Sequence, residues 1–191
     1  MSLSELIAAN RSYRSFDPAT KLNRETLAEW VNAARLSPSS RNLQPLKFRL
    51  VYEASECDKV LPSTRWAGYL QGCEIPPAGH APTAYIIICL DTALTTNPAP
   101  FQRDVGICAQ SILLAATEAG FGGCMIGSFS PDAIKSDLAL PQEIEPQLVL
   151  ALGRPDETVA LTEVASDGNI KYYRENGIHY VPKRALEDIL L

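Results

Sequence analysis

The chain has 191 residues, of which 46% are hydrophobic and 20% are charged, and its formal net charge is −5. This length and composition are typical of one compact domain, which we expect to span residues 1–191. Because the balance is acidic, we expect no nucleic acid or membrane partner, and any bound anion needs cations close to it.

The cysteines of the chain are five in number, with no C-x-x-C pair among them. This usage predicts free thiols in a reducing compartment rather than a disulfide framework. The N-terminal residues contain no long apolar segment of the kind found in signal peptides. The longest apolar run, residues 84–90, is too short to cross a bilayer. We therefore expect a cytoplasmic protein.

Two helices are predicted near the N-terminus. Ser2 and Glu5 form the S-x-x-E pattern of a capping box, which predicts a helix ending near Asn10. Asn23 is the candidate N-cap of a second helix, whose apolar residues follow 3.6-residue spacing until Ser37-Pro38 stops it. The next segment, SPSSRNLQP, reads as a polar loop between two prolines.

Strands and a long helix are predicted in the middle of the chain. Alternation over residues 48–52 indicates a strand, whereas residues 84–90 and 147–153 are apolar on both faces and indicate buried strands. Residues 104–119 are helical and apolar nearly all round, so this helix is expected centrally or in a subunit interface. A glycine-rich turn and a short strand follow, and Ser130-Pro131 opens a small helix.

The remaining segments give weaker signals. Residues 53–83 contain several prolines and read as mostly irregular, with a short helix over residues 66–70. Residues 154–168 read as a loop, and Asn176-Gly177 is the signature of a two-residue type I′ hairpin. Lys183 and Arg184 are expected to open a final amphipathic helix. The alternation of strands and helices indicates an α+β or mixed α/β fold.

Several kinds of chemistry are weakly supported. The chain has two histidines, His80 and His179, and neither shows metal-ligand spacing, so we expect surface or hairpin histidines and no metal site. The sequence contains no G-x-S-x-G elbow and no P-loop. The GFGG segment precedes a strand instead of following one, so it is not a dinucleotide fingerprint.

Clusters of cations occur near both ends of the chain. Arg11 and Arg14 follow the first helix, and Lys183 and Arg184 lie near the C-terminus. The planar fork of arginine suits phosphate because it forms bidentate, charge-assisted hydrogen bonds. Either cluster alone is more often a solvated surface pair, and only the fold decides whether the two converge.

Five segments in order carry a resemblance to a known family: RSYRSF, SPSSRNLQP, DVGICAQSILLAATEAGFGGCMIG, ALGRP and VPKR. Through the order and spacing of these segments, the chain resembles the FMN-dependent nitroreductase family over most of its length. The resemblance is weakest over residues 53–83. The resemblance implies an α+β fold with a central, mostly antiparallel sheet flanked by helices. It also implies an intertwined homodimer with FMN sites at the subunit interface and the 104–119 helix at its core.

The resemblance also implies a set of cofactor-binding residues. Arg11 would contact the FMN phosphate, Ser12 the phosphate or ribityl chain, and Arg14 the pyrimidine edge of the flavin. Arg184, helped by Lys183, would close over the phosphate. The flavin ring would lie along Met125, Ile126 and Gly127, near the less securely aligned Gln71 and Trp66. The other subunit would contribute Pro38, Ser39, Ser40 and Asn42, whereas Arg41 is expected to face solvent.

The implied activity is hydride transfer from NAD(P)H to flavin N5, followed by reduction of a nitroaromatic, quinone or similar small-molecule acceptor in a ping-pong scheme. The flavin carries this chemistry, so the protein needs no catalytic acid or base. Two alternatives remain open: a specialised flavoenzyme that dehalogenates, oxidises a heterocycle or fragments flavin, or a non-catalytic flavin-binding protein. The resemblance does not separate NADH from NADPH, and the 170–181 hairpin is expected to cover part of the pocket mouth.

Overall fold

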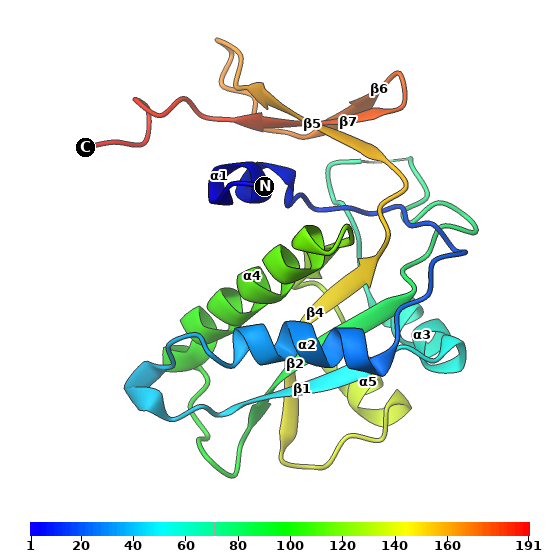
Figure 1. Cartoon of the computed structure of the whole chain (residues 1–191), viewed down its shortest axis with the longest axis vertical. Helices are drawn as coiled ribbons and strands as arrows, with labels where there is room; N and C mark the ends of the chain where they lie inside the picture. The colour runs from blue at the N-terminus through cyan, green and yellow to red at the C-terminus, as the bar shows by residue number, and fades with distance from the viewer. Residues whose placement is uncertain (71) are drawn as a thin grey trace.

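A computed structural model of the protein describes residues 1–70 and 72–191. Its centre is a four-stranded antiparallel sheet in the order β1-β2-β4-β3 (Figure 1). The bounds of these strands are Leu46–Val51 for β1, Ala84–Asp91 for β2, Gly122–Ile126 for β3 and Ile144–Gly153 for β4. The predicted strands are therefore confirmed, as is the mostly antiparallel central sheet.

Strand β2 lies inside the sheet, and its two faces belong to different cores. Ile86 and Ile88 pack in a cluster with α2 (Arg24–Ala34) and α4 (Gln102–Glu118). Tyr85 and Ile87 point the other way, into a cluster covered by α3 and α5. The bounds of these two helices are Ala54–Val60 for α3 and Pro131–Asp137 for α5. The continuous apolar run thus reflects burial on both sides.

The helix ends follow the expected capping rules. The capping box of Ser2 and Glu5 is present and begins α1 (Leu3–Ala9), which ends at Asn10. The side chain of Asn23 accepts a hydrogen bond of 2.9 Å from the backbone N–H of Thr26 at the start of α2. Three 3₁₀ helices complete the set of helices: η1 (Ser40–Asn42), η2 (Leu61–Ser63) and η3 (Ala99–Phe101).

A second, three-stranded sheet stands apart from the central one, above α1 in Figure 1. It has the order β5-β7-β6, with β5 parallel to β7 and β6 antiparallel to it. Its strands are β5 (Thr158–Glu163), β6 (Tyr173–Glu175) and β7 (Ile178–Lys183). The turn between β6 and β7 has positive φ at Asn176 and Gly177, 50° and 79°, so the predicted hairpin is confirmed.

Three local predictions are wrong. Residues 154–168 are not a loop throughout, because β5 pairs with β7 along its length. Residues 66–70 form a turn and no helix, and a helix, α3, lies earlier in that irregular region. The C-terminal helix is absent: Lys183 ends β7, and the tail makes only single turns whose apolar residues Leu186 and Ile189 are 60% and 61% exposed. A short helix without packing is only marginally stable.

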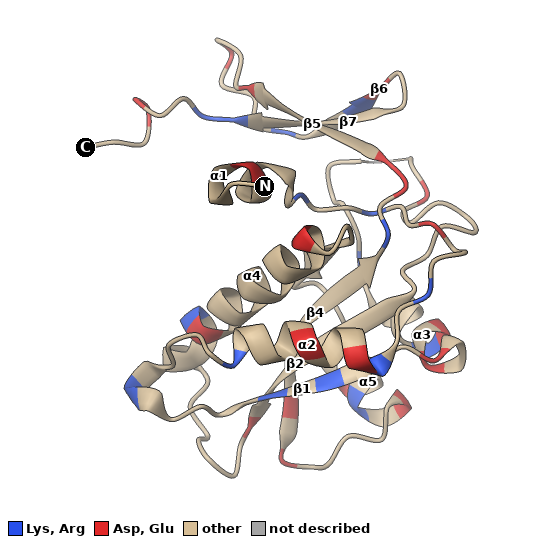
Figure 2. Cartoon of the chain, in the orientation of Figure 1, with Lys and Arg blue, Asp and Glu red and all other residues tan. Residues whose placement is uncertain are grey.

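Charged residues are spread over helices, strands and loops, and most of α4 carries none, as Figure 2 shows. Helix α4 is uncharged between Asp104 at its start and Glu118 at its end. Its Ile107 is 40% exposed, so an apolar part of this helix is uncovered in the single chain. In the part of the chain that the structure describes, no helix is both long enough and apolar enough to cross a membrane.

Candidate cofactor site

The segment RSYRSF lies along the exposed edge of the central sheet, beside β3. Ser12 forms a bridge with Gly123, and the backbone N–H of Tyr13 donates a 3.0 Å hydrogen bond to the carbonyl of Gly123. A Cβ on Gly122 would lie 2.6 Å from the Tyr13 ring, and one on Gly123 only 2.4 Å from the carbonyl oxygen of Ala151. The two glycines therefore allow β3 to lie this close to the Tyr13 ring and to the backbone of β4.

A cavity of about 360 Å³ opens where this segment meets the C-terminal sheet. Arg11, Arg14 and Lys183 contribute three cationic side chains to its wall, and none of the described residues that line it is acidic. Arg11 and Arg14 of the first cationic cluster thus meet Lys183 of the second here through the fold. Its volume lies in the range of roughly 300–1,000 Å³ that is common for small-molecule sites. In an acidic protein, this cavity is a local site for an anion.

Two buried nitrogen atoms at this cavity have no hydrogen-bond partner among the described residues: Nε of Arg11 and Nδ1 of His179. Arg11 also donates from Nη2 to the carbonyl of Ile7 at 2.8 Å, which anchors its side chain to the end of α1. A buried donor without a partner costs about 1–3 kcal/mol. Because this nitrogen is enclosed in this structure, a ligand oxygen reaches it only when the Arg11 side chain shifts, whereas the cationic lining itself fits a phosphorylated ligand.

Arg14 is fixed from several sides. Its Nη1 lies 3.3 Å from the carbonyl oxygen of Ser12 and 3.3 Å from Nε2 of His179, and its guanidinium lies 5.0 Å from the centre of the Tyr172 ring. Its backbone N–H donates to the carboxylate of Glu157, which also accepts a 2.7 Å hydrogen bond from Arg174. These contacts hold the cation at the cavity wall.

His179, Tyr172 and Glu157 are site residues that sequence reasoning missed. His179 lies in the hairpin as expected, yet it is 2% exposed, so a surface position is wrong for it. Burial and the neighbouring Arg14 lower the pKa of His179 below its ordinary value, which favours a neutral imidazole. By contrast, His80 is partly exposed, and its Nδ1 lies 2.7 Å from Asp156. No local pattern marks the difference.

A second cavity, of about 340 Å³, adjoins the first along β3. Arg14, Met125 and Tyr172 line both cavities, so the two share a wall, and we call them together the trough. Ile126 and Gly127 line the second one together with Trp66. The structure therefore brings Met125, Ile126 and Gly127 together with Arg14, and Trp66 lines the same cavity. Gln71, the other candidate from this region, lies outside the described residues.

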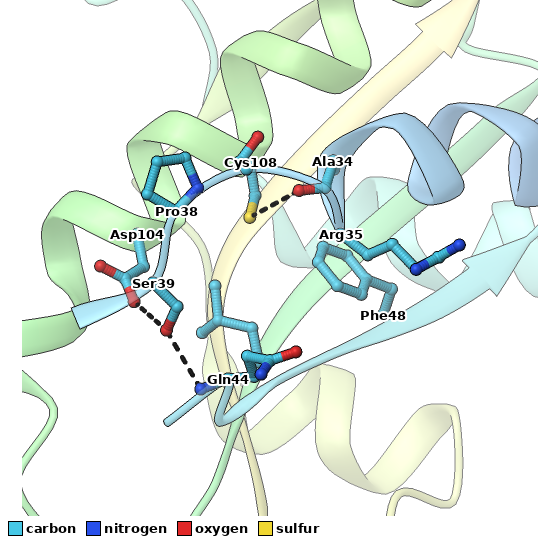
Figure 3. Close-up of a pocket in the computed structure, with 10 residues that line it drawn as sticks. Ala34, Arg35, Pro38, Ser39, Gln44, Phe48, Asp104 and Cys108 are labelled. Carbon is cyan, nitrogen blue, oxygen red and sulfur yellow. Dashed lines mark hydrogen bonds between the residues drawn. The ribbon is translucent and has the colours of Figure 1, made fainter. Parts of the chain in front are cut away.

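The loop after α2 belongs to a different cavity, of about 160 Å³, shown in Figure 3. Pro38 and Ser39 line it beside Asp104, whose carboxylate accepts hydrogen bonds from the Ser39 hydroxyl and the Ser40 backbone N–H. Asn42 is exposed, as is Arg41. Within one chain these residues do not line the cavities that contain Arg11 and Arg14.

Lys183 and Arg184 differ in position. Lys183, at the end of β7, lines the first cavity, whereas Arg184 is exposed and lines none of these three cavities. The contact of Arg184 with a phosphate stays a prediction. Pairing of β6 with β7 stops at Tyr180, so the Pro182 ring lies where β7 is unpaired on that side. A proline is tolerated there because its missing N–H faces no partner strand.

An α+β fold with a cationic trough beside its sheet edge, and no carboxylate among the described residues that line it, suits an anionic small molecule. Residues 7–154 match the Nitroreductase family, so the chain belongs to this family of oxidoreductases. An NADPH-flavin oxidoreductase of Vibrio harveyi is 28% identical over 169 residues, which cover 80% of this chain and 65% of that protein.

Solved structures show the same fold. The nitroreductase family protein of Streptococcus pneumoniae TIGR4 superposes with a TM-score of 0.71 at 18% identity and covers 100% of this chain and 99% of its own. An FMN-dependent nitroreductase of Clostridium difficile R20291 superposes with a TM-score of 0.65 at 22% identity and covers 91% of this chain and 99% of its own. The predicted nitroreductase fold is thereby confirmed.

Proposed function

We propose that the protein is an FMN-dependent NAD(P)H oxidoreductase, formed by one domain over residues 1–191, that reduces a nitroaromatic, quinone or similar small acceptor. The observation that carries this proposal is the trough in which Arg11, Arg14 and Lys183 converge without an acidic neighbour among the described lining residues. The names of the Vibrio and Clostridium proteins, which specify a flavin and FMN, support the same cofactor.

The phosphate of FMN would be held at the Arg11 end of the trough. It carries nearly two negative charges, and hydrogen bonds to a charged group contribute about 1.5–3 kcal/mol each. The unpaired Nε of Arg11 supplies one donor for it, and Ser12 and Lys183 lie in the same cavity wall. Arg184 is proposed to join them when the C-terminal tail packs on a second subunit.

The flavin ring would lie along Met125, Ile126 and Gly127. Met125 is 38% exposed, and a Cβ on Gly127 would have open space around it, so β3 presents an accessible, uncharged surface here. The cation of Arg14 lies where it would stabilise negative charge on the pyrimidine side of the ring. Once bound, the flavin supplies the hydride acceptor for NAD(P)H and the electrons for the second substrate. The protein itself provides binding, orientation and charge, and we assign no catalytic acid or base.

A homodimer is part of the proposal. Helix α1 buries none of its residues, and its Leu3 and Ile7 are 67% and 46% exposed. The exposed Ile107 on the uncharged part of α4 and the apolar C-terminal tail add to this uncovered surface. A second copy would cover it and would bring its Pro38, Ser39, Ser40 and Asn42 to the trough. This arrangement explains why the loop lies away from the arginine cluster within one chain.

Anaerobic reduction of the purified protein tests the proposal. We expect bound flavin whose visible absorption is bleached by NADPH or NADH and restored by a quinone or nitroaromatic acceptor. Flavin that neither nicotinamide reduces would favour a non-catalytic flavin-binding protein. Reduction that the usual acceptors do not reverse would favour a specialised flavoenzyme, and a chain that binds no FMN would contradict the proposal.

A further inference from the structure

We propose that His179 is a ligand-binding residue that also positions Arg14, with its neutral ring accepting from the guanidinium at Nε2 and donating from Nδ1 to an oxygen of the bound cofactor. This inference rests on the proposed FMN site. It assigns a direct role to the C-terminal sheet, which lies beyond residues 7–154, the part of the chain that matches the family.

The contact with Arg14 fixes the tautomer of the imidazole. Nε2 of His179 lies 3.3 Å from Nη1 of Arg14. A guanidinium has only donors and stays protonated, so Nε2 has to present its lone pair. The single proton of the neutral ring is therefore on Nδ1. Arg14 thereby gains an acceptor that fixes one arm of its fork in the trough.

The Nδ1–H of His179 is then a donor without an acceptor. It is fully enclosed and has no partner among the described residues, in a side chain that lines the same cavity as Arg11, Ser12 and Lys183. Nε of Arg11 is unpaired at that cavity too. Both nitrogens are enclosed in this structure, so a ligand oxygen reaches them only when the two side chains shift. Two such N–H groups on side chains that line one cationic cavity point to one oxygen-rich ligand, because leaving both unsatisfied is costly.

The surroundings keep the ring neutral and in place. The Tyr172 ring packs against it with centroids 5.4 Å apart. The charged groups that influence it are Arg14 and Arg174, both cationic, and the carboxylate of Glu157, which is already engaged by Arg174. A protonated ring would add a further positive charge beside two arginines. A neutral donor therefore suits this position better than a charged one.

The acceptor is an oxygen of a phosphorylated polyol, the part of FMN that would lie in this cavity. A phosphate oxygen and a ribityl hydroxyl share this chemistry. Riboflavin, which lacks the phosphate, and inorganic phosphate, which lacks the polyol, separate them. If the NMR signal of His179 Nδ1 moves with FMN and with inorganic phosphate but not with riboflavin, the acceptor is a phosphate oxygen. If it moves with FMN and with riboflavin but not with inorganic phosphate, the acceptor is a ribityl hydroxyl.

The first experiment is NMR of the flavin-free full chain labelled with ¹⁵N in its histidines. The chain has two histidines, so His80→Gln assigns both sets of signals. We expect the ring of His179 to carry its proton on Nδ1 before ligand is added, and the Nδ1 signal to move when FMN binds. A proton on Nε2, or an Nδ1 signal that saturating FMN does not move, would overturn the inference.

The second experiment measures FMN affinity by quenching of flavin fluorescence. Loss of the histidine ring in His179→Ala should weaken binding about tenfold or more, as expected for loss of a hydrogen bond to a charged ligand group. His179→Asn keeps a donor near the position of Nδ1 and should recover part of the affinity. His80→Ala is the matched control, because His80 lies outside the trough, and should bind FMN as the wild type does.

The outcomes separate the two proposals. If the wild type binds FMN and a folded His179→Ala variant binds it equally well, His179 is merely structural and the inference fails while the proposed function stands. If the wild type binds no FMN, the proposed function fails and the ligand contact fails with it. If His179→Ala does not fold, the NMR experiment on the wild type tests the inference instead: an Nδ1 signal that moves on FMN binding supports the ligand contact, and one that does not move overturns it.

Discussion

The hydroxyl of Ser39 donates a 2.7 Å hydrogen bond to the carboxylate of Asp104, a side chain that is only 4% exposed (Figure 3). The backbone N–H of Ser40 donates to the same oxygen at 2.9 Å. Asp104 lies in the first turn of α4, where the helix dipole favours a negative charge. The carboxylate thus links the polar loop after α2 to the long helix.

Asp104→Ala should lower the free energy of unfolding by about 1–3 kcal/mol, because it leaves the Ser39 hydroxyl and the Ser40 N–H without their acceptor. Ser39→Ala removes one of the two hydrogen bonds and should cost less. Chemical denaturation of both variants and of the double variant measures the coupling between them. Additive effects in this cycle would show that the hydrogen bond does not stabilise the loop.

Gly123→Ala should destabilise the protein by about 1–3 kcal/mol, the usual effect of overpacking. The new Cβ would lie 2.4 Å from the Ala151 carbonyl and 2.8 Å from the Leu113 side chain. Gly127→Ala, one residue after the end of β3, is the control, because nothing lies within 4 Å of the added carbon. Thermal unfolding should therefore separate the two variants, and equal melting temperatures would contradict this account of the glycines.

Stability should fall as the pH drops from about 7 to about 5, owing to His179. Its folded pKa lies below 6.5, because burial and Arg14 disfavour the charged ring. Below pH 6.5 the unfolded chain therefore binds a proton that the folded chain does not, and the loss is at most about 1.4 kcal/mol per pH unit. Denaturant titrations at several pH values give the free energy of unfolding as a function of pH. This free energy should fall less steeply with decreasing pH in His179→Gln than in His80→Gln, and an equal pH dependence in the two variants would exclude this role for His179.

The cysteines should differ sharply in reactivity. Burial raises the pKa of Cys57 to about 11 and that of Cys89 to about 12, and it also raises the pKa values of Cys108 and Cys124. Cys73 is exposed. Because thiol reagents attack the thiolate, native protein should show one fast-reacting thiol that Cys73→Ser removes. All five should react after unfolding, and fast labelling of a second native thiol would argue against this burial.

The central fold was predictable because its signals are local. The apolar run at 84–90 encodes burial on both faces, and Asn23 and the Ser2–Glu5 pair begin helices by short-range hydrogen bonds. The β5–β7 pairing was missed because it joins Thr158 to Ile178 in parallel across a non-local connection, although the β-branched residues of TVALTE carry a strand signal.

The candidate site was predictable only in part. Arg11, Arg14 and Lys183 could be selected as cations suited to phosphate, with their convergence left to the fold. The burial of His179 and the pairing of Glu157 with Arg174 depend on how the C-terminal sheet packs over Arg14, which no spacing in the sequence specifies. The arrangement of two subunits cannot be predicted from the hydrophobic periodicity of one chain either.

FMN titration of the wild type, Arg11→Ala and Arg41→Ala tests the central claim most directly. Arg11 lines the cationic trough with an unpaired Nε, whereas Arg41 is exposed in the loop after α2. We predict that the wild type and Arg41→Ala bind FMN tightly, and that Arg11→Ala loses most of its FMN while its melting temperature changes little. A wild-type protein that stays colourless throughout the titration, or an Arg11→Ala variant that keeps its full complement of flavin, would contradict the account.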